Sequence, residues 1–305
     1  MEFLQETLRE SVRKLANIGE SHFLKGALSL KRFHERFGWN EEMLSVLKAR
    51  SKWQEYPLVQ GQFSPLVNKQ AIQPTPQMAK RMIGRGMFPQ AYFTSFAWYQ
   101  QEGLEAIIMS FRDRAIHEMS YLGHSWSVWC SFFEIIQGDL TEEDRLYTLE
   151  RFVEFAAKTF PGYPTSDSKW VPPVQEDPGP LHFSEVLDQV LEKPGFYGHH
   201  LLTLGYLYRH QSLLEEREWN VGLHEVKRMT EKVYIDNEDN VWVPRDQVQI
   251  TVVTEEDLLE SIQQLLQNGP KDLHALTVAD ISYDIWQVAD DRQRNHLLAF
   301  LQSLT

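Results

Sequence analysis

The sequence has very little cysteine: its 305 residues contain one, Cys130. A single cysteine excludes an internal disulfide framework and any zinc site built from cysteine pairs. Cys130 lies in the apolar run of residues 128–133, which favours a buried structural thiol over a reactive nucleophile. We therefore do not expect the function of this chain to depend on sulfur chemistry.

Positive charge and long apolar runs are also scarce. The chain carries 30 Lys and Arg against 43 Asp and Glu, a formal net charge of −13, which argues against nucleic acids and anionic membranes as partners. No stretch approaches the roughly 20 apolar residues that a membrane span requires. The N-terminal residues also lack the apolar segment of a signal peptide. We expect a cytoplasmic protein without membrane association.

Apolar residues at spacings of three and four predict that most of the chain is helical. Thr141 and Thr254, each followed by three acidic residues, are typical of helix N-caps. The expected helices cover residues 3–18, 21–37, 40–53, 89–137 (two helices broken near 116–120), 141–160, 183–193, 196–214, 218–234, 254–268, 271–287 and 289–303.

Two irregular stretches and one β pattern interrupt the expected helices. Residues 57–76 form a proline-containing connection, and residues 161–180 hold six prolines, which predicts a surface loop or a lid over about 161–181. Residues 233–253 resemble a small β-hairpin, with apolar β-branched and aromatic residues on either side of a polar turn. Helices on both sides of the proline-rich loop have broad apolar faces that need partners. We expect one all-α, bundle-like domain spanning residues 1–305.

The sharp sequence signatures of several enzyme classes do not occur. Glu-x-x-His, His-Glu-x-x-His and His-x-Asp/Glu are missing, which argues against di-iron bundles, zincins and many 2-His-1-carboxylate iron sites. There is no P-loop, and residues 84–86 lack the third glycine of a dinucleotide-binding loop. Ser125 lies in a partial esterase elbow, but Ser127 replaces its last glycine and a helical pattern replaces the strand that should precede it.

Histidines embedded among apolar residues are the remaining candidates for chemistry. They are His22, His124, His199, His200 and His274. Water is scarce in such surroundings, so each imidazole needs a partner. Any one of them is most simply explained as a core histidine bonded to a carbonyl or a carboxylate. Together, on separate helices, they suit a metal site built from facing helices. The residues alone leave both interpretations open.

Four short patches resemble, in order, segments of the questin oxidase-like family, an all-helical group that includes fungal enzymes that open anthraquinone rings. The patches are residues 21–30 (SHFLKGALSL), residues 103–108 followed by His124, residues 200–209 (HLLTLGYLYR) and residues 272–276 (DLHAL). The resemblance implies a mononuclear iron held by four histidines: His22, His124, His200 and His274. Some family members add a modified lysine one turn after the last histidine, where this chain has Thr277.

The resemblance also implies a mono- or dioxygenase that uses O₂ on a cyclic or aromatic metabolite. Interior aromatic side chains can wall a substrate pocket, although at helical spacing they form cores more often. The candidate substrate-binding residues are Trp126, Trp129, Tyr206 and Thr277. The family's link to NADPH-dependent Baeyer–Villiger chemistry makes NADPH a further candidate co-substrate, but the sequence carries no nicotinamide motif.

A second hypothesis is a non-catalytic all-α binding or assembly protein whose histidines satisfy hydrogen bonds in the core. The acidic composition and the lack of sharp enzyme motifs fit this hypothesis. The two hypotheses differ in the metal content of the purified protein. The oligomeric state is left open by the sequence, with a homodimer among the possibilities.

Overall fold

The computed structural model describes residues 2–13, 21–50, 74–119, 122–162, 179–231, 240–241, 244–270 and 273–305. Within these residues the expectation of an all-α fold is confirmed. No helix in them is both long enough and apolar enough to cross a bilayer. The helices are α1 (Glu2–Arg13), α2 (His22–Phe37), α3 (Glu41–Arg50), α5 (Pro76–Gly84), α6 (Gln90–Met109), α7 (Arg112–His117), α8 (His124–Ile136), α9 (Glu142–Thr159), α10 (Phe183–Glu192), α11 (His199–Arg209), α12 (Glu216–Glu231), α13 (Glu255–Asn268), α14 (Leu273–Val288) and α15 (Asp291–Ser303).

Side-chain caps determine where several helices begin. Thr141 accepts a hydrogen bond from the backbone N–H of Asp144 at the start of α9 (3.2 Å). Thr254 and Asp257 form a reciprocal capping box at the start of α13. These caps satisfy N–H groups that have no partner inside the helix, and both confirm the predicted helix starts.

Two parts of the helical prediction were wrong. Residues 89–137 are divided more often than expected: Gly103 (φ 82°) breaks α6 internally, and Ser110 and Phe111 separate α6 from the short α7 before the expected break ahead of α8. Ser110 is the C-cap of α6, and its hydroxyl donates to the Ile107 carbonyl (2.7 Å). Helix α5 was not predicted, although Thr75 as its N-cap and Pro76 as its first residue are sequence signals for a helix start.

The described residues do not show the hairpin predicted over 233–253. Strand β2 (Asn240–Val241) instead pairs antiparallel with β1 (Gly195–Phe196), a segment about forty-five residues earlier. Residues 232–239 and 242–243, which would have formed much of the hairpin, lie outside the described part of the chain. The same holds for residues 163–178, which include most of the proposed lid.

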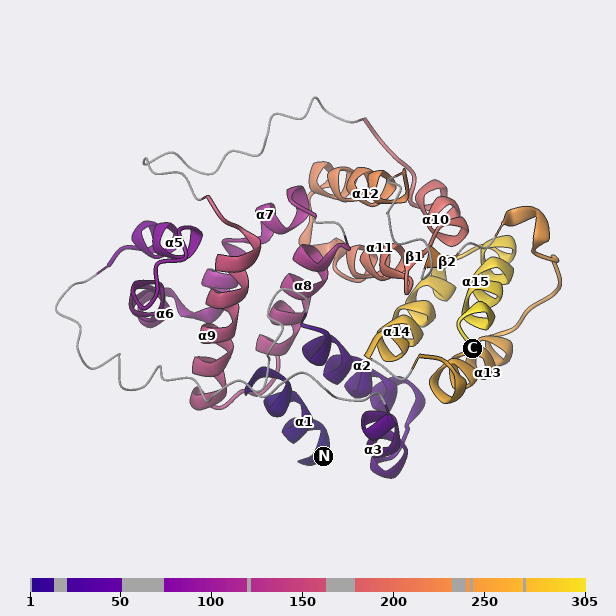
Figure 1. Cartoon of the computed structure of the whole chain (residues 1–305), viewed down its shortest axis with the longest axis horizontal. Helices are drawn as coiled ribbons and strands as arrows, with labels where there is room; N and C mark the ends of the chain where they lie inside the picture. Colours follow the sequence, from indigo (N-terminus) through magenta and orange to yellow (C-terminus); the bar gives the residue numbers. More distant parts are fainter. Residues whose placement is uncertain are drawn as a thin grey trace. The chain divides into compact units, whose positions relative to one another are not determined.

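The chain divides into two compact units, each made of several segments. The first comprises Met1–Leu28, Gln54–Glu118 and Val128–Glu176. In it α9 packs against α1, α5 and α6 (Figure 1). Its interior holds an aromatic cluster in which Phe152 contacts Phe111, Phe132 and Phe155 at ring-centroid distances of 5.4–5.9 Å.

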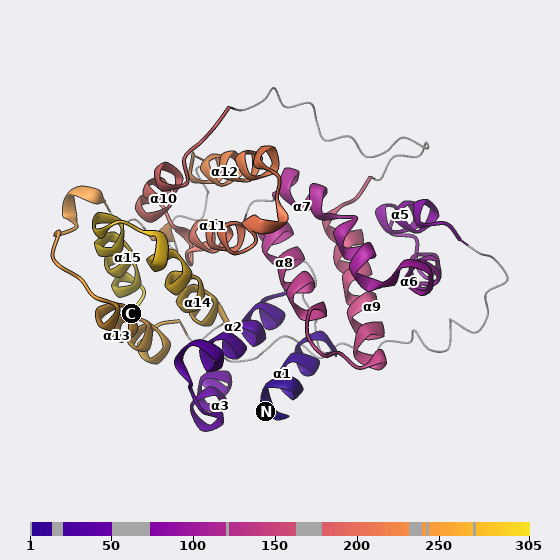
Figure 2. The ribbon, with the colours of Figure 1, turned by 180° about the vertical axis from the view of Figure 1, so that it is seen from behind.

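The second unit comprises Ser29–Trp53, Met119–Ser127 and Asp177–Thr305. Helices α13, α14 and α15 pack against one another, as do α10, α11 and α12, and these arrangements can be followed from both sides (Figures 1 and 2). Helix α11 also packs along α14, and this contact links the two groups of helices. That all 305 residues form a single domain stays a prediction.

Candidate metal centre

The histidines that the sequence singles out lie at the starts of helices. His22, His124 and His199 are the first residues of α2, α8 and α11, and His274 is the second residue of α14. Side chains in the first turn of a helix lie beside the chain that leads into it. Their orientation therefore depends on the backbone just before the helix.

That preceding backbone is left-handed in three of these helices. Ser21 (φ 43°) precedes His22, Gly123 (φ 66°) precedes His124, and Gly198 (φ 77°) precedes the helix of His199. Glycine adopts this region freely, whereas an L-residue with a side chain does so at a cost. The left-handed residue makes a sharp turn, so each helix begins abruptly at its histidine.

His22, His199 and His274 come together in a group that can hold a metal ion. Each offers one ring nitrogen, and these atoms all lie within 4.8 Å of one another. His199 is buried, while His22 and His274 are half-buried. His199 and His274 belong to the second unit. His22 is the first residue of α2, a continuous helix whose residues from Ser29 onward also belong to the second unit. The prediction that histidines from separate helices converge is therefore confirmed.

The ring of His199 is oriented by the chain that precedes it. Its Nδ1 forms a short hydrogen bond with the carbonyl oxygen of Phe196, the last residue of β1. A carbonyl oxygen only accepts, so Nδ1 carries the proton and Nε2 carries the lone pair. Metal-binding histidines commonly donate their second ring nitrogen to a carbonyl or carboxylate in this way, which fixes the tautomer and the ring.

Two aromatic side chains flank the group. Tyr197 stacks on the His274 ring with the centroids 5.1 Å apart and the planes 18° apart, and Phe196 stacks on His199 at 5.7 Å. Tyr197 has a positive φ of 44°, an unfavourable conformation for a bulky residue. Such strained residues cluster at functional sites. Among the described residues the non-glycine positions with positive φ are Ser21 and Tyr197, and both adjoin this group.

His124 lies against the group without supplying one of its three nitrogens. Its ring meets that of His199 edge-on at 5.0 Å and an interplanar angle of 84°. Helices α8 and α11 approach closely at this point, since a Cβ built on Gly123 would lie 1.8 Å from Oγ1 of Thr203. Only glycine allows this approach.

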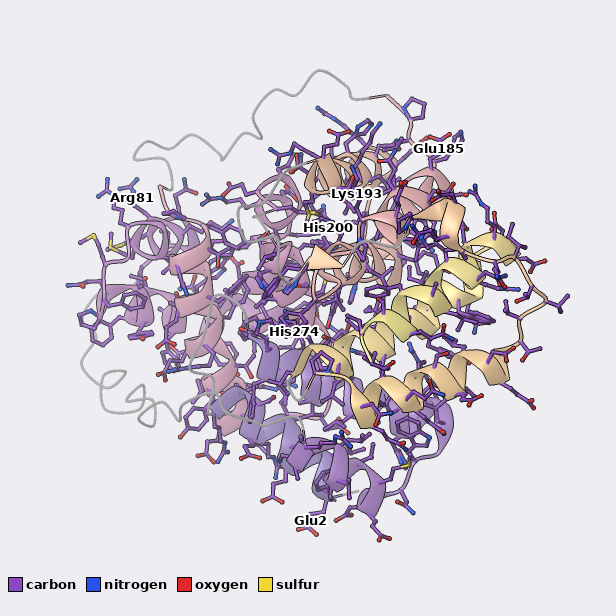
Figure 3. The ribbon with its side chains drawn as sticks, turned by 45° about the vertical axis from the view of Figure 1, so that its right-hand side comes forward. Glu2, Arg81, Glu185, Lys193, His200 and His274 are labelled. Atoms are coloured by element: carbon purple, nitrogen blue, oxygen red, sulfur yellow. The ribbon has the colours of Figure 1, made fainter. Side chains whose placement is uncertain are left out.

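His200, the ligand predicted on α11, does not belong to the group of three. Its Nδ1–H donates to the carbonyl oxygen of Lys193 (2.7 Å), and the two residues are labelled close together in Figure 3. A Cβ built on Gly195 would lie 2.8 Å from the His200 ring. Burial lowers the pKa of His200, and the Lys193 bond opposes this shift only in part. The sequence named both neighbours as candidates, and the family resemblance pointed to His200 rather than His199; the two share the same apolar setting. The orientation of the His199 ring depends on the Phe196 carbonyl in β1, a strand that the sequence analysis did not predict.

The residues proposed to bind substrate lie in the interior. Trp126, Trp129 and Tyr206 are fully buried. The Trp129 indole N–H donates to the Ile108 carbonyl (2.8 Å). Thr277 is buried too, and its hydroxyl donates to the backbone carbonyls of its own helix at 3.1 and 3.3 Å. A role in substrate binding stays a prediction for all four.

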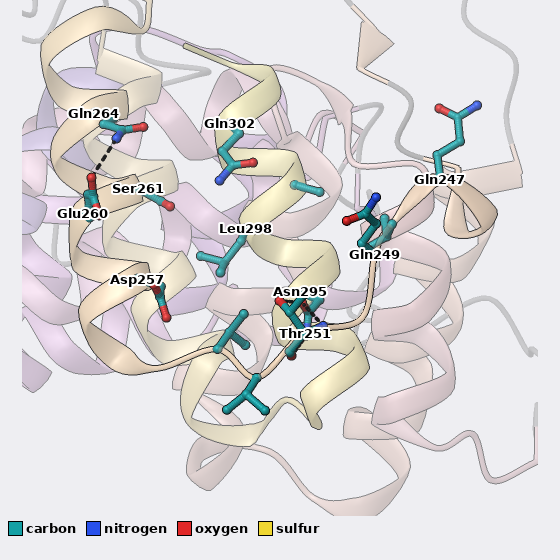
Figure 4. A pocket seen from close by; sticks show the side chains of 14 residues that line it. Gln247, Gln249, Thr251, Asp257, Glu260, Ser261, Gln264, Asn295, Leu298 and Gln302 are labelled. Atoms are coloured by element: carbon teal, nitrogen blue, oxygen red, sulfur yellow. Dashed lines mark hydrogen bonds between the residues drawn. The ribbon is translucent and has the colours of Figure 1, made fainter.

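A separate hollow of about 480 Å³ lies between α13, α15 and residues 247–253 (Figure 4). Its walls are mainly polar, and Asn295 binds the backbone of Thr251 through both ends of its amide. None of the candidate histidines lines it.

The donor set of the histidine group fits a transition-metal ion. Imidazole nitrogen suits zinc, copper, iron and nickel, whereas magnesium and calcium prefer oxygen. Three protein ligands leave further coordination positions open, as in catalytic rather than structural sites. No known family, characterised protein or solved structure matches this chain.

Proposed function

We propose that the protein binds one transition-metal ion, iron, through His22, His199 and His274, and that it is an oxygenase or oxidase acting on a cyclic or aromatic metabolite. The observation that carries the proposal is the approach of three ring nitrogens to within 4.8 Å, from three helices far apart in the sequence. The carbonyl-bound tautomer of His199 supports it, because that ring already offers Nε2 as a donor.

Iron is proposed because of the donor set and the resemblance to questin oxidase-like proteins. When bound, iron would supply the one-electron chemistry with O₂ that protein side chains lack. The three imidazoles are uncharged ligands, so the full charge of the ion would remain at the site. His22 and His274 are half-buried rather than fully buried, which supports access of small molecules to the group.

The rings of Phe196 and Tyr197 support an aromatic or cyclic substrate. Both are half-buried and stack on ligand rings, so they present apolar surface next to the proposed ion. Flat apolar molecules bind to aromatic side chains by offset or edge-to-face stacking. We propose O₂ and one small molecule as the reactants. A need for NADPH stays a prediction from the resemblance alone.

Metal analysis tests the first part of the proposal. Protein purified without chelator should carry a near-stoichiometric transition metal, measured by mass spectrometry, and His22→Ala and His274→Ala should each lose it. His210→Ala is the matched control, because His210 is buried and bonds the Tyr206 carbonyl through Nδ1 without belonging to the group. Metal-free wild-type protein, or full retention in both variants, would instead support the binding or assembly protein.

Oxygen uptake tests the second part. Iron-loaded protein should consume O₂ in the presence of some members of a panel of phenols and quinones, and zinc-loaded protein should not. Equal uptake with both metals, or none with any compound, would contradict the oxygenase assignment and leave only the metal site.

A further inference from the structure

The three helices of the histidine group carry a second set of interacting residues, all charged, further along each helix. Arg32 and Arg36 follow His22 by 10 and 14 residues, Arg209 follows His199 by 10, and Asp280 and Asp284 follow His274 by 6 and 10. At about 1.5 Å per residue, these positions lie about 9–21 Å along their helices from the histidines.

These charged residues contact one another across the helices. Asp284 on α14 accepts from Arg209 on α11 (2.5 Å) and from Arg36 on α2 (2.6 Å). Asp280, one turn before Asp284, accepts from Arg32 on α2 (2.7 Å). We call Arg32, Arg36, Arg209, Asp280 and Asp284 the charge clamp.

Asp280 is the centre of the charge clamp. Its side chain is 0% exposed, and it also receives bonds from Arg209 (3.1 Å), Arg36 (3.1 Å) and the Ser29 hydroxyl (3.1 Å). Burial alone would raise the pKa of Asp280, but the nearby arginines, Arg209 and Arg32 foremost, lower it below its ordinary value. Asp280 is therefore ionised, and the clamp holds three guanidinium groups against two carboxylates.

Contacts at both levels constrain how the helices lie. Since α2, α11 and α14 meet at their histidines and again six to fourteen residues later, they run in the same direction. Sliding one helix by a single residue would move its histidine about 1.5 Å and turn it about 100°. Either change would take the imidazole nitrogen out of a group only 4.8 Å across.

Between the two levels, α11 and α14 touch closely. A Cβ on Gly205 would lie 2.1 Å from Cγ2 of Ile281. This apolar contact brings the two helices together but leaves small sliding motions possible. Guanidinium–carboxylate pairs are directional, with paired N–H groups facing paired oxygens, so they hold the helices in one register. Buried ion pairs contribute little net stability compared with apolar residues, and setting a register is their best-attested role.

We propose that the charge clamp is a positioning device for the metal site: it sets the register of α2, α11 and α14 and thereby brings the three histidines into one coordination sphere. This inference rests on the proposed metal site. The clamp residues do not touch the reacting groups; they act through the helices.

The test compares cobalt(II) binding in the full chain with and without an intact clamp. Asp284→Asn removes one charge at constant shape, Arg209→Met removes the guanidinium, and Arg209→Lys keeps the charge without the paired N–H groups. Leu265→Ala is the control, because this fully buried apolar residue lies on α13, a helix that carries no residue of the clamp or of the histidine group. Cobalt affinity and the visible absorption spectrum of the bound ion are measured at a temperature where circular dichroism shows every variant folded.

We expect Asp284→Asn and Arg209→Met to weaken cobalt binding at least tenfold and to shift the spectrum, with Arg209→Lys between them and wild type. Leu265→Ala should lower the melting temperature and leave affinity and spectrum unchanged. Unchanged binding in the clamp variants, or equal weakening in Leu265→Ala, would overturn the inference while the metal site stands. Wild-type protein that binds no cobalt would overturn the proposed metal site and this inference together.

Discussion

The Nδ1–H of His199 donates to the carbonyl oxygen of Phe196, three residues earlier in the chain. Phe196 ends a two-residue strand that pairs with Asn240–Val241. The strand thus carries the carbonyl group that orients the His199 ring, while His200 bonds the Lys193 carbonyl.

Replacing His199 and His200 by alanine, one at a time, tests which of the two binds the metal. His199→Ala should lose bound metal, because it removes a nitrogen of the group. His200→Ala should keep the metal and lower stability by about 1–3 kcal/mol, the typical cost of a broken buried hydrogen bond. Metal content and urea denaturation measure the two effects. If His200→Ala loses the metal and His199→Ala keeps it, the ligand set implied by the family resemblance would be favoured.

Tyr197 combines backbone strain with a stacking contact, and substitutions can separate them. Tyr197→Gly relieves a left-handed conformation worth about 1–2 kcal/mol but removes the ring that stacks on His274. We expect weaker metal binding at little or no cost in stability. Tyr197→Phe keeps both strain and stacking and should bind metal as wild type does. If the phenylalanine variant binds as weakly as the glycine variant, the hydroxyl matters and the stacking argument fails.

Gly205→Ala should push α11 and α14 apart. The new Cβ would meet Cγ2 of Ile281 at 2.1 Å, and overpacking of this kind costs about 1–3 kcal/mol. Metal affinity should fall as well, since these helices carry His199 and His274. The double variant Gly205→Ala/Ile281→Ala should regain part of the affinity, because the clashing methyl is gone. Purely additive losses would show that the two positions are not coupled.

Low pH should selectively remove the contribution of Asp280 to the free energy of unfolding. The folded-state pKa of this carboxylate is lowered, so its stabilisation is fully present above the unfolded pKa of about 3.9 and is lost as pH falls through the folded value. At pH 7 Asp280→Asn should cost about 3–5 kcal/mol, because the variant leaves buried arginines short of a partner. The stability difference between wild type and variant should shrink below about pH 4. A difference that stays constant down to pH 2 would contradict the assignment.

The all-α fold class was predictable because the spacing of apolar residues every 3.6 positions is a local property of the chain. The caps at Thr141 and Thr254 were predictable for the same reason. The β1–β2 pairing was not, since two-residue strands leave almost no periodicity and their partner lies far along the chain. The separation of α6 from α7 at residues 110–111 was not predictable, since the apolar pattern continues across it.

The candidate site was predictable in part. His22 and His274 stand out from the sequence as histidines among apolar neighbours, and both belong to the group. The clamp leaves no single spacing in the sequence, because its residues follow their histidines by 6, 10 or 14 positions. The pairs between them exist only where the three helices lie together.

By itself, the sequence determined a helical chain that lacks sulfur ligands and places histidines at helix starts, because propensity, capping and composition act over a few residues. Tertiary structure alone decided which nitrogens meet. His22 and His274 are separated by most of the chain, and the ion pair between Arg32 and Asp280 spans 248 residues. Contacts between residues so far apart depend on how the helices pack, and helix packing cannot be predicted from the local sequence around each residue.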